Sequence, residues 1–130
     1  MPTTITVLLV EDDLVDARSI AGMLAGARSF AAAVTAAGSL DEAAAALARG
    51  RFDAILLDLG LPDSFELETL AKVLPLAAGA PVVVISGLED PEFAARARRQ
   101  GAAAYLFKEG LDAPALERAL AGALAGRAPG

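Results

Sequence analysis

Five short apolar runs, each about the length of a β-strand, recur along the 130-residue chain and are separated by segments of helical periodicity. Three of them are nearly continuous in Val, Ile and Leu, which is typical of strands covered on both faces. The second run is mostly alanine, so its prediction as a strand depends on its place in the series. The five runs are Ile5 to Val10, Phe30 to Ala36, Phe52 to Leu57, Pro81 to Ile85, and Ala102 to Phe107.

The segments between these runs carry apolar residues at helical spacing, as in Ala17, Ile20, Ala21 and Leu24. Residues that favour the ends of helices flank the same segments, which supports the assignment. Start signals are the capping-box pair Ser39 and Glu42, Asp90 followed by Pro91, and Asp112, and stop signals are Gly50 and Gly101.

Strand and helix therefore alternate five times, which is typical of a parallel sheet joined by right-handed helical crossovers. We expect a doubly wound α/β fold of the flavodoxin-like type, a five-stranded parallel sheet in the order 2-1-3-4-5 with helices on both faces. The length suits one domain. We expect residues 1–130 to form a single unit, with a core of about residues 4–125 and a short flexible tail from Gly126 to Gly130.

The sequence has no cysteine and no histidine, which excludes disulfides, Cys-based zinc sites, Ser-His-Asp triads and imidazole metal ligands. Any metal site would therefore be built from oxygen ligands. The formal net charge of −6 argues against direct binding of nucleic acid. The run from Ile5 to Val10 lacks the features of a signal peptide, and no segment is long enough to span a bilayer. We expect a soluble cytoplasmic protein that does not contact a membrane.

Charged and polar residues directly follow four of the five runs. Parallel strands end at one edge of the sheet, where ligands bind, so we expect these residues to lie together. Each also has an ordinary structural explanation, as a helix cap, a turn residue or a solvated surface charge. Their occurrence at four strand ends favours one shared functional site over four separate structural roles. They are Glu11, Asp12 and Asp13 after the first run, Asp58 after the third, Ser86 and Gly87 after the fourth, and Lys108 after the fifth.

Carboxylates crowded at one edge repel one another unless a cation neutralises them. Mg²⁺ meets this need, with Mn²⁺ as a substitute, because it binds carboxylate oxygens and bridges them to phosphoryl groups. A carboxylate beside such an ion can attack phosphorus and form an aspartyl phosphate. The ammonium of Lys108 and the hydroxyl of Ser86 would then donate to the phosphoryl oxygens.

Over essentially its whole length the chain resembles the receiver domain of two-component response regulators. Four stretches match the family's motifs in order and spacing. They are Leu8 to Asp13, Leu56 to Asp63, Val83 to Gly87, and Gly101 to Lys108.

This resemblance implies a role for each residue of the cluster. Asp58 would be the phosphoacceptor, and Glu11 and Asp12 would hold Mg²⁺ together with it. Ser86 would be the switch hydroxyl, and Lys108 would pair with the phosphoryl group. Asp13 falls outside the acidic pair and is expected to cap the first helix. Tyr105 matches the family's aromatic switch position, although an ordinary half-buried aromatic residue explains it equally well.

The implied function is a phosphoacceptor signalling domain, which promotes only its own phosphorylation and dephosphorylation. The donor would be a histidine kinase or a phosphotransfer protein. The surface of helix four, strand five and helix five would bind a downstream protein target, and the chain would be a monomer or a weak dimer through that surface. Arg96, Arg98 and Arg99 on helix four either bind an acidic partner or form a solvated helix face. The chain acts alone or as a module of a larger protein.

Two positions depart from the family's pattern. Glu109 replaces the usual proline after Lys108, and Glu66 replaces a glycine beyond the acceptor, so both loops are expected to differ. These departures motivate one alternative, a pseudo-receiver that serves only as an interaction module. A second alternative is a Mg²⁺-dependent phosphatase of the haloacid dehalogenase class. Such enzymes need a second Asp two residues after the nucleophile, where this chain has Gly60.

Overall fold

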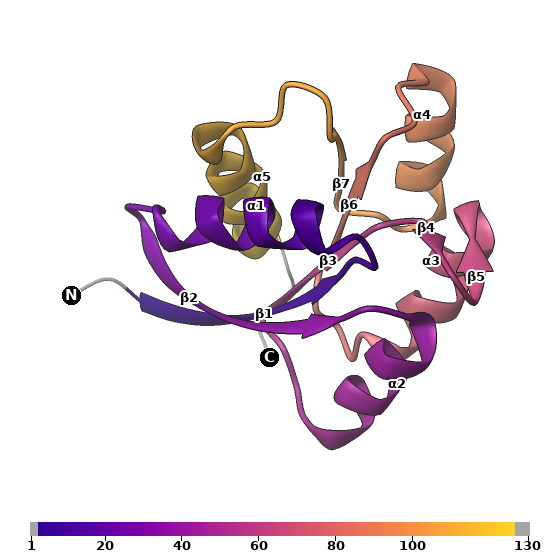
Figure 1. Cartoon of the computed structure of the whole chain (residues 1–130), viewed down its shortest axis with the longest axis horizontal. Coiled ribbons are helices and arrows are strands. Elements are labelled where there is room, and N and C mark those ends of the chain that lie inside the picture. Colours follow the sequence, from indigo (N-terminus) through magenta and orange to yellow (C-terminus); the bar gives the residue numbers. More distant parts are fainter. Residues whose placement is uncertain (1–2, 127–130) are drawn as a thin grey trace.

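The computed structural model describes residues 3–126 and contains a five-stranded parallel sheet with helices on both faces (Figure 1). The expected C-terminal tail falls outside the described residues from position 127 onward. The strands of the main sheet are β1 (Thr3–Val10), β2 (Phe30–Ala37), β3 (Ala54–Leu57), β6 (Val82–Ser86) and β7 (Ala104–Phe107). The helices are α1 (Leu14–Ala25), α2 (Leu40–Arg49), α3 (Glu66–Val73), the 3-10 helix η1 (Leu74–Leu76), α4 (Pro91–Gln100) and α5 (Ala113–Ala125).

The strand order confirms the predicted doubly wound topology. The sheet runs β2-β1-β3-β6-β7, which is 2-1-3-4-5 when only its own strands are counted, and all four pairings are parallel. A small antiparallel hairpin, β4 (Gly60–Leu61) with β5 (Ser64–Phe65), was not predicted from the sequence. Two-residue strands carry too few residues to produce a periodic pattern.

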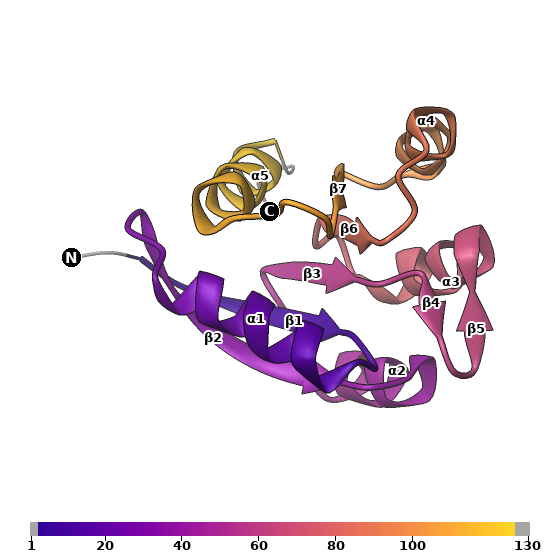
Figure 2. The same cartoon turned by 45° about the horizontal axis from the view of Figure 1, so that its top comes forward.

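Two hydrophobic cores cover the two faces of the sheet. Helices α1 and α5 lie together on one face, while α2, α3 and α4 follow one another along the other face (Figure 2). The central strands β3 and β6 are buried along their whole length, as their continuous apolar sequences predict. Among residues 3–126, no helix is both long and apolar enough to cross a membrane.

Three strands begin later than predicted, β6 by one residue and β3 and β7 by two. Asp53 precedes β3 and is bound to β1 through both its backbone and its side chain. Its N–H donates to the Thr6 carbonyl at 2.8 Å, and its carboxylate accepts from the N–H and hydroxyl of Thr6. Before β7, the Ala102 N–H donates to the Ala97 carbonyl and therefore extends the end of α4. The alanine-rich β2 forms as predicted, because it pairs with β1 over eight residues.

The predicted helix signals are confirmed at the backbone. The Ser39 hydroxyl accepts from the Glu42 N–H, and the carboxylates of Asp90 and Asp112 accept from N–H groups in the first turns of α4 and α5. Gly50 and Gly101 are the C-caps of α2 and α4. Gly101 has φ of 136°, a backbone conformation that strongly favours glycine.

The loop after β3 keeps a left-handed residue where the family's glycine is missing. Glu66 has φ of 55°, and its N–H donates to the Leu59 carbonyl at 2.8 Å, which closes the β4–β5 hairpin onto the end of β3. Buried Thr69 fixes the same loop, because its hydroxyl donates to the Leu59 carbonyl at 3.1 Å. The loop therefore retains its closed form at the cost of backbone strain at Glu66.

Replacing Glu66 by glycine should stabilise the protein by about 1 kcal/mol, because glycine adopts positive φ without a steric penalty. Urea unfolding measures this change in the free energy of unfolding. Glu68→Gly is the matched control, since Glu68 lies within α3 and its removal should destabilise the protein by about 1 kcal/mol. A loss of stability in both variants would contradict the assignment of strain to Glu66.

Candidate functional site

Backbone pairing at the carboxyl edge of the sheet brings the predicted site residues together. The Asp58 N–H donates to the Val10 carbonyl at 2.9 Å, so the residue after β3 is aligned with the end of β1. The Lys108 N–H donates to the Ser86 carbonyl at 2.8 Å, which aligns the residue after β7 with the end of β6. Glu11 directly follows β1. The positions of these side chains thus follow from the register of the parallel strands.

Three carboxylates form a cluster at this edge. One oxygen from each of Glu11, Asp12 and Asp58 lies within 4.8 Å of the others. Glu11 and Asp58 are buried, whereas Asp12 is exposed. One Asp58 oxygen, Oδ1, accepts from the Gly60 N–H at 3.1 Å. The cluster has the donor atoms and the spacing to hold a divalent cation that prefers oxygen ligands.

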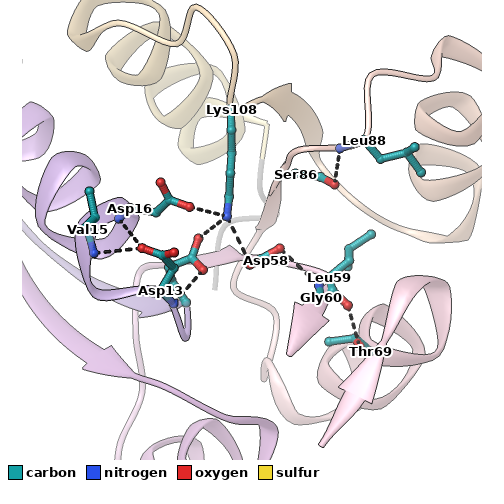
Figure 3. A network of polar contacts seen from close by, with 11 residues as sticks. Asp13, Val15, Asp16, Asp58, Leu59, Gly60, Thr69, Ser86, Leu88 and Lys108 are labelled. Carbon is teal, nitrogen blue, oxygen red and sulfur yellow. Dashed lines mark hydrogen bonds and ion pairs between the residues drawn. The ribbon is translucent and has the colours of Figure 1, made fainter. Parts of the chain in front are cut away.

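The ammonium of Lys108 lies directly against this cluster (Figure 3). Its Nζ is 2.6 Å from Glu11 Oε1 and 3.2 Å from Asp58 Oδ2. A further carboxylate, that of Asp16 in the first turn of α1, has its Oδ2 at 2.9 Å from the same Nζ. Within the described part of the chain, buried Glu11 Oε1 accepts no hydrogen bond of good geometry. The polar group that it contacts is the ammonium of Lys108, through the ion pair at 2.6 Å.

The surroundings of the site raise the pKa of both Glu11 and Lys108. Burial and the adjacent Asp58 carboxylate raise the pKa of Glu11 from its ordinary 4.5 to about 7, against the influence of Lys108. For Lys108, burial by itself would lower the pKa. The contacts with Glu11 and Asp16 and the charge of Asp58 outweigh burial and raise the pKa well above its ordinary value. The lysine is therefore fully charged at neutral pH.

Ser86 and Tyr105 are joined through one loop residue. The Ser86 hydroxyl accepts from the Leu88 N–H at 3.1 Å, and the Tyr105 hydroxyl donates to the Leu88 carbonyl at 2.9 Å. Tyr105 is buried, and its ring packs edge-on against Phe93 of α4 and Phe107 of β7. A movement of the β6–α4 loop would therefore change the hydrogen bonds of both side chains.

A hollow of about 280 Å³ opens beside Asp58. Small Gly60 and Gly87 lie in its wall, which leaves room next to the Asp58 carboxylate. Glu66 also lines it, so the substituted loop position faces the approach to the site. The residues lining the hollow are Asp58, Leu59, Gly60, Glu66, Ser86, Gly87, Leu88 and Phe93.

The second departure from the family's pattern leaves the site in place. No peptide bond among residues 3–126 is cis, so Glu109 follows Lys108 through a trans bond. Lys108 nevertheless reaches the acidic cluster. The loop around Glu109 is thus compatible with the lysine position that the sequence predicted.

Three polar residues near the site were missed by sequence reasoning. Asp63 caps α2 from the β4–β5 hairpin, accepting from the N–H groups of Leu40 and Asp41 at 2.8 and 3.0 Å. Thr69 secures the same hairpin, and Asp16 binds Lys108. A carboxylate in the first turn of a helix is an ordinary pattern, so the sequence gives no signal that distinguishes Asp16.

Comparison with known proteins gives one consistent result. The family model for the response regulator receiver domain matches residues 7–121. A gliding motility regulatory protein of Myxococcus xanthus is 34% identical over 116 residues, covering 88% of this chain and 14% of its own length. The chain thus spans about one seventh of that relative.

Solved structures share the fold. A two-component response regulator of the LuxR family from Aurantimonas sp. SI85-9A1 aligns with a TM-score of 0.82 at 23% identity, covering 96% of this chain and 88% of its own. The CheX–CheY–BeF₃–Mg²⁺ complex from Borrelia burgdorferi aligns with a TM-score of 0.76 at 21% identity, covering 89% of this chain and 86% of the matched chain. At these identities the likeness shows the fold.

The raised pKa of Glu11 gives a pH dependence with a definite sign. A carboxyl group with a higher pKa in the folded chain holds its proton more tightly when folded. Its stabilising contribution is therefore present below its ordinary pKa of 4.5 and is lost as pH rises through about 7. Relative to Glu11→Gln, the metal-free wild type should lose about 2 kcal/mol of stability between about pH 5 and pH 8.

Urea unfolding of the two proteins across this pH range measures the difference. Subtracting the Glu11→Gln values removes the contributions of groups that titrate equally in both proteins. A stability difference that does not change with pH would contradict the raised pKa of Glu11.

Proposed function

Because the chain belongs to the family of response regulator receiver domains, we propose that it accepts a phosphoryl group on Asp58 from a histidine kinase or a phosphotransfer protein. The supporting observation is the contact of Lys108 Nζ with Asp58 Oδ2 at 3.2 Å, beside the cluster that Asp58 forms with Glu11 and Asp12. Receiver domains of two-component signalling are signalling domains and not enzymes acting on separate substrates.

The donor set at this edge fits Mg²⁺, or Mn²⁺ in its place. Glu11, Asp12 and Asp58 would hold the ion, because their oxygens converge and the buried Glu11 Oε1 has no good hydrogen bond among residues 3–126. When bound, the ion neutralises the clustered charge and that of the phosphoryl group. The Borrelia neighbour, a complex with Mg²⁺ and BeF₃, supports this assignment.

In the proposed reaction, a carboxylate oxygen of Asp58 attacks the phosphorus of a phosphohistidine. The new O–P bond forms as the N–P bond breaks, and the imidazole nitrogen keeps the electron pair. Lys108 needs little movement to pair with a phosphoryl oxygen, because its ammonium already contacts the Asp58 carboxylate. The hollow beside Asp58, with Gly60 and Gly87 in its wall, gives the donor access.

Ser86 and Tyr105 would carry the signal outward. A phosphoryl oxygen on Asp58 would attract the Ser86 hydroxyl, which now accepts from the Leu88 N–H. The loop would shift, and the Tyr105 hydroxyl would lose its acceptor, the Leu88 carbonyl. The changed surface of α4, β7 and α5 would then bind a downstream protein. We propose a monomer or a weak dimer through this surface.

The two alternatives receive less support. A pseudo-receiver would not need the acidic cluster and Lys108 in contact, and neither Glu66 nor Glu109 displaces them. A phosphatase would need a second acid where Gly60 stands, beside the Asp58 carboxylate.

Incubation with acetyl phosphate and Mg²⁺, followed by intact-mass analysis, tests the proposal. The wild type should gain the mass of one phosphoryl group, and the gain should require the metal. Asp58→Asn should abolish it because the attacking oxygen is lost. Asp63→Asn is the matched control. It should still be labelled, because Asp63 lies in the same loop as Asp58 but binds the N-terminus of α2 and not the site.

Labelling that persists in Asp58→Asn would contradict the assignment of the acceptor. If the wild type is not labelled, and binds its protein partner equally well with and without acetyl phosphate, the pseudo-receiver would be favoured. Continuous hydrolysis of small phosphomonoesters would favour the phosphatase.

A further inference from the structure

Lys108 has a partner that lies outside the acidic cluster proposed to hold the metal. Lys108 Nζ is 2.6 Å from Glu11 Oε1, 2.9 Å from Asp16 Oδ2 and 3.2 Å from Asp58 Oδ2. Asp16 comes from α1, so the lysine at the end of β7 joins that helix to the ends of β1 and β3. Figure 3 shows Asp16 and Asp58 both directed at the ammonium of Lys108, the first from α1 and the second from the sheet.

The turn that carries Asp16 is fixed by its own hydrogen bonds. Asp13 caps α1, with its Oδ1 accepting from the N–H groups of Val15 and Asp16 at 2.9 and 3.0 Å. Glu11 Oε2 in turn accepts from the Asp13 N–H at 3.2 Å. The side chain of Asp16 takes no part in this capping, so changing it leaves the N-cap intact. Its position relative to Lys108 is set by the backbone.

The three carboxylates that contact Lys108 differ in their exposure to solvent and in whether they belong to the proposed metal site. The side chains of Glu11 and Asp58 are 1% and 10% exposed, whereas that of Asp16 is 41% exposed. An ammonium group has three donors. If Asp16 were absent, those donors would fall on Glu11 and Asp58, the oxygens that a divalent cation needs. Lysine and cation would then compete for the same two carboxylates.

We propose that Asp16 is a positioning residue, which draws part of the hydrogen bonding of the Lys108 ammonium toward α1 and thereby weakens its competition with the divalent cation for Glu11 and Asp58. This inference rests on the proposed function, because the cation is the one that phosphoryl transfer to Asp58 requires. Asp16 acts through Lys108 and touches neither the cation nor the phosphoryl group.

Calorimetric titration of the unphosphorylated protein with Mg²⁺ tests the proposal in a double-mutant cycle. Asp16→Asn should raise the Kd for Mg²⁺ roughly threefold or more, because Lys108 then competes with the ion. In a Lys108→Met background the same change should alter the Kd by less than about 1.5-fold, since the remaining charge effect of an exposed group is screened. Glu109→Gln, the same charge change beside Lys108, should also stay within about 1.5-fold.

A spectroscopic readout follows Lys108 directly. The sequence has two lysines, Lys72 and Lys108, so the side-chain Cε–Hε signals in NMR spectra of the full chain are readily assigned. Asp16→Asn should shift the signal of Lys108 and leave that of Lys72, which pairs with Glu68 on α3, unchanged.

The outcomes separate this inference from the proposed function. If wild type binds no Mg²⁺, or binds it independently of Asp58, the proposed function fails and the inference with it. If Mg²⁺ binds through Asp58 but Asp16→Asn leaves the Kd and the Lys108 signal unchanged, only the inference is overturned. An equal change of Kd with and without Lys108 also overturns it, because Asp16 would then act by charge alone.

Discussion

The ion pairs between Lys108 and the carboxylates around it are the interaction on which the site depends. Parallel strands that end at one edge bring Glu11 and Asp58 together in a buried place, where two negative charges repel. The ammonium of Lys108 compensates this repulsion, with Nζ at 2.6 Å from Glu11 and 3.2 Å from Asp58. Even so, burial and the adjacent Asp58 carboxylate raise the pKa of Glu11 to about 7 against the influence of Lys108. A divalent cation bound by these carboxylates would favour their charged forms.

The surrounding loops hold this arrangement despite two unusual residues. Glu66 adopts φ of 55°, and the bonds that Thr69 makes to Leu59 and Ser64 keep the hairpin closed. Asp63 anchors the same hairpin to α2. The strained position is thus held by contacts from two neighbouring helices. Side-chain contacts of Thr69 and Asp63 thus hold the hairpin next to Glu66 closed.

The sequence predicted the sheet, the strand order and the clustering of Glu11, Asp58 and Lys108, because strand periodicity and parallel topology determine which chain ends meet. It placed the start of β3 two residues too early, because the apolar run begins at Phe52, before the segment that pairs with β1. It did not identify Asp16, because an acid in the first turn of a helix has the same pattern whether or not it meets a lysine. Contacts between distant side chains depend on helix orientation, which the local pattern does not encode.

The most direct test of the account is a crystal structure of the protein with Mg²⁺ and BeF₃⁻, a tetrahedral mimic of the phosphoryl group. The account predicts beryllium bonded to an Asp58 oxygen, a Mg²⁺ ion within about 2.1 Å of oxygens from Glu11, Asp12 and Asp58, and Lys108 Nζ in contact with a fluoride. Beryllium on another side chain, or Lys108 turned away from an Asp58 adduct with no ion among the acids, would contradict it.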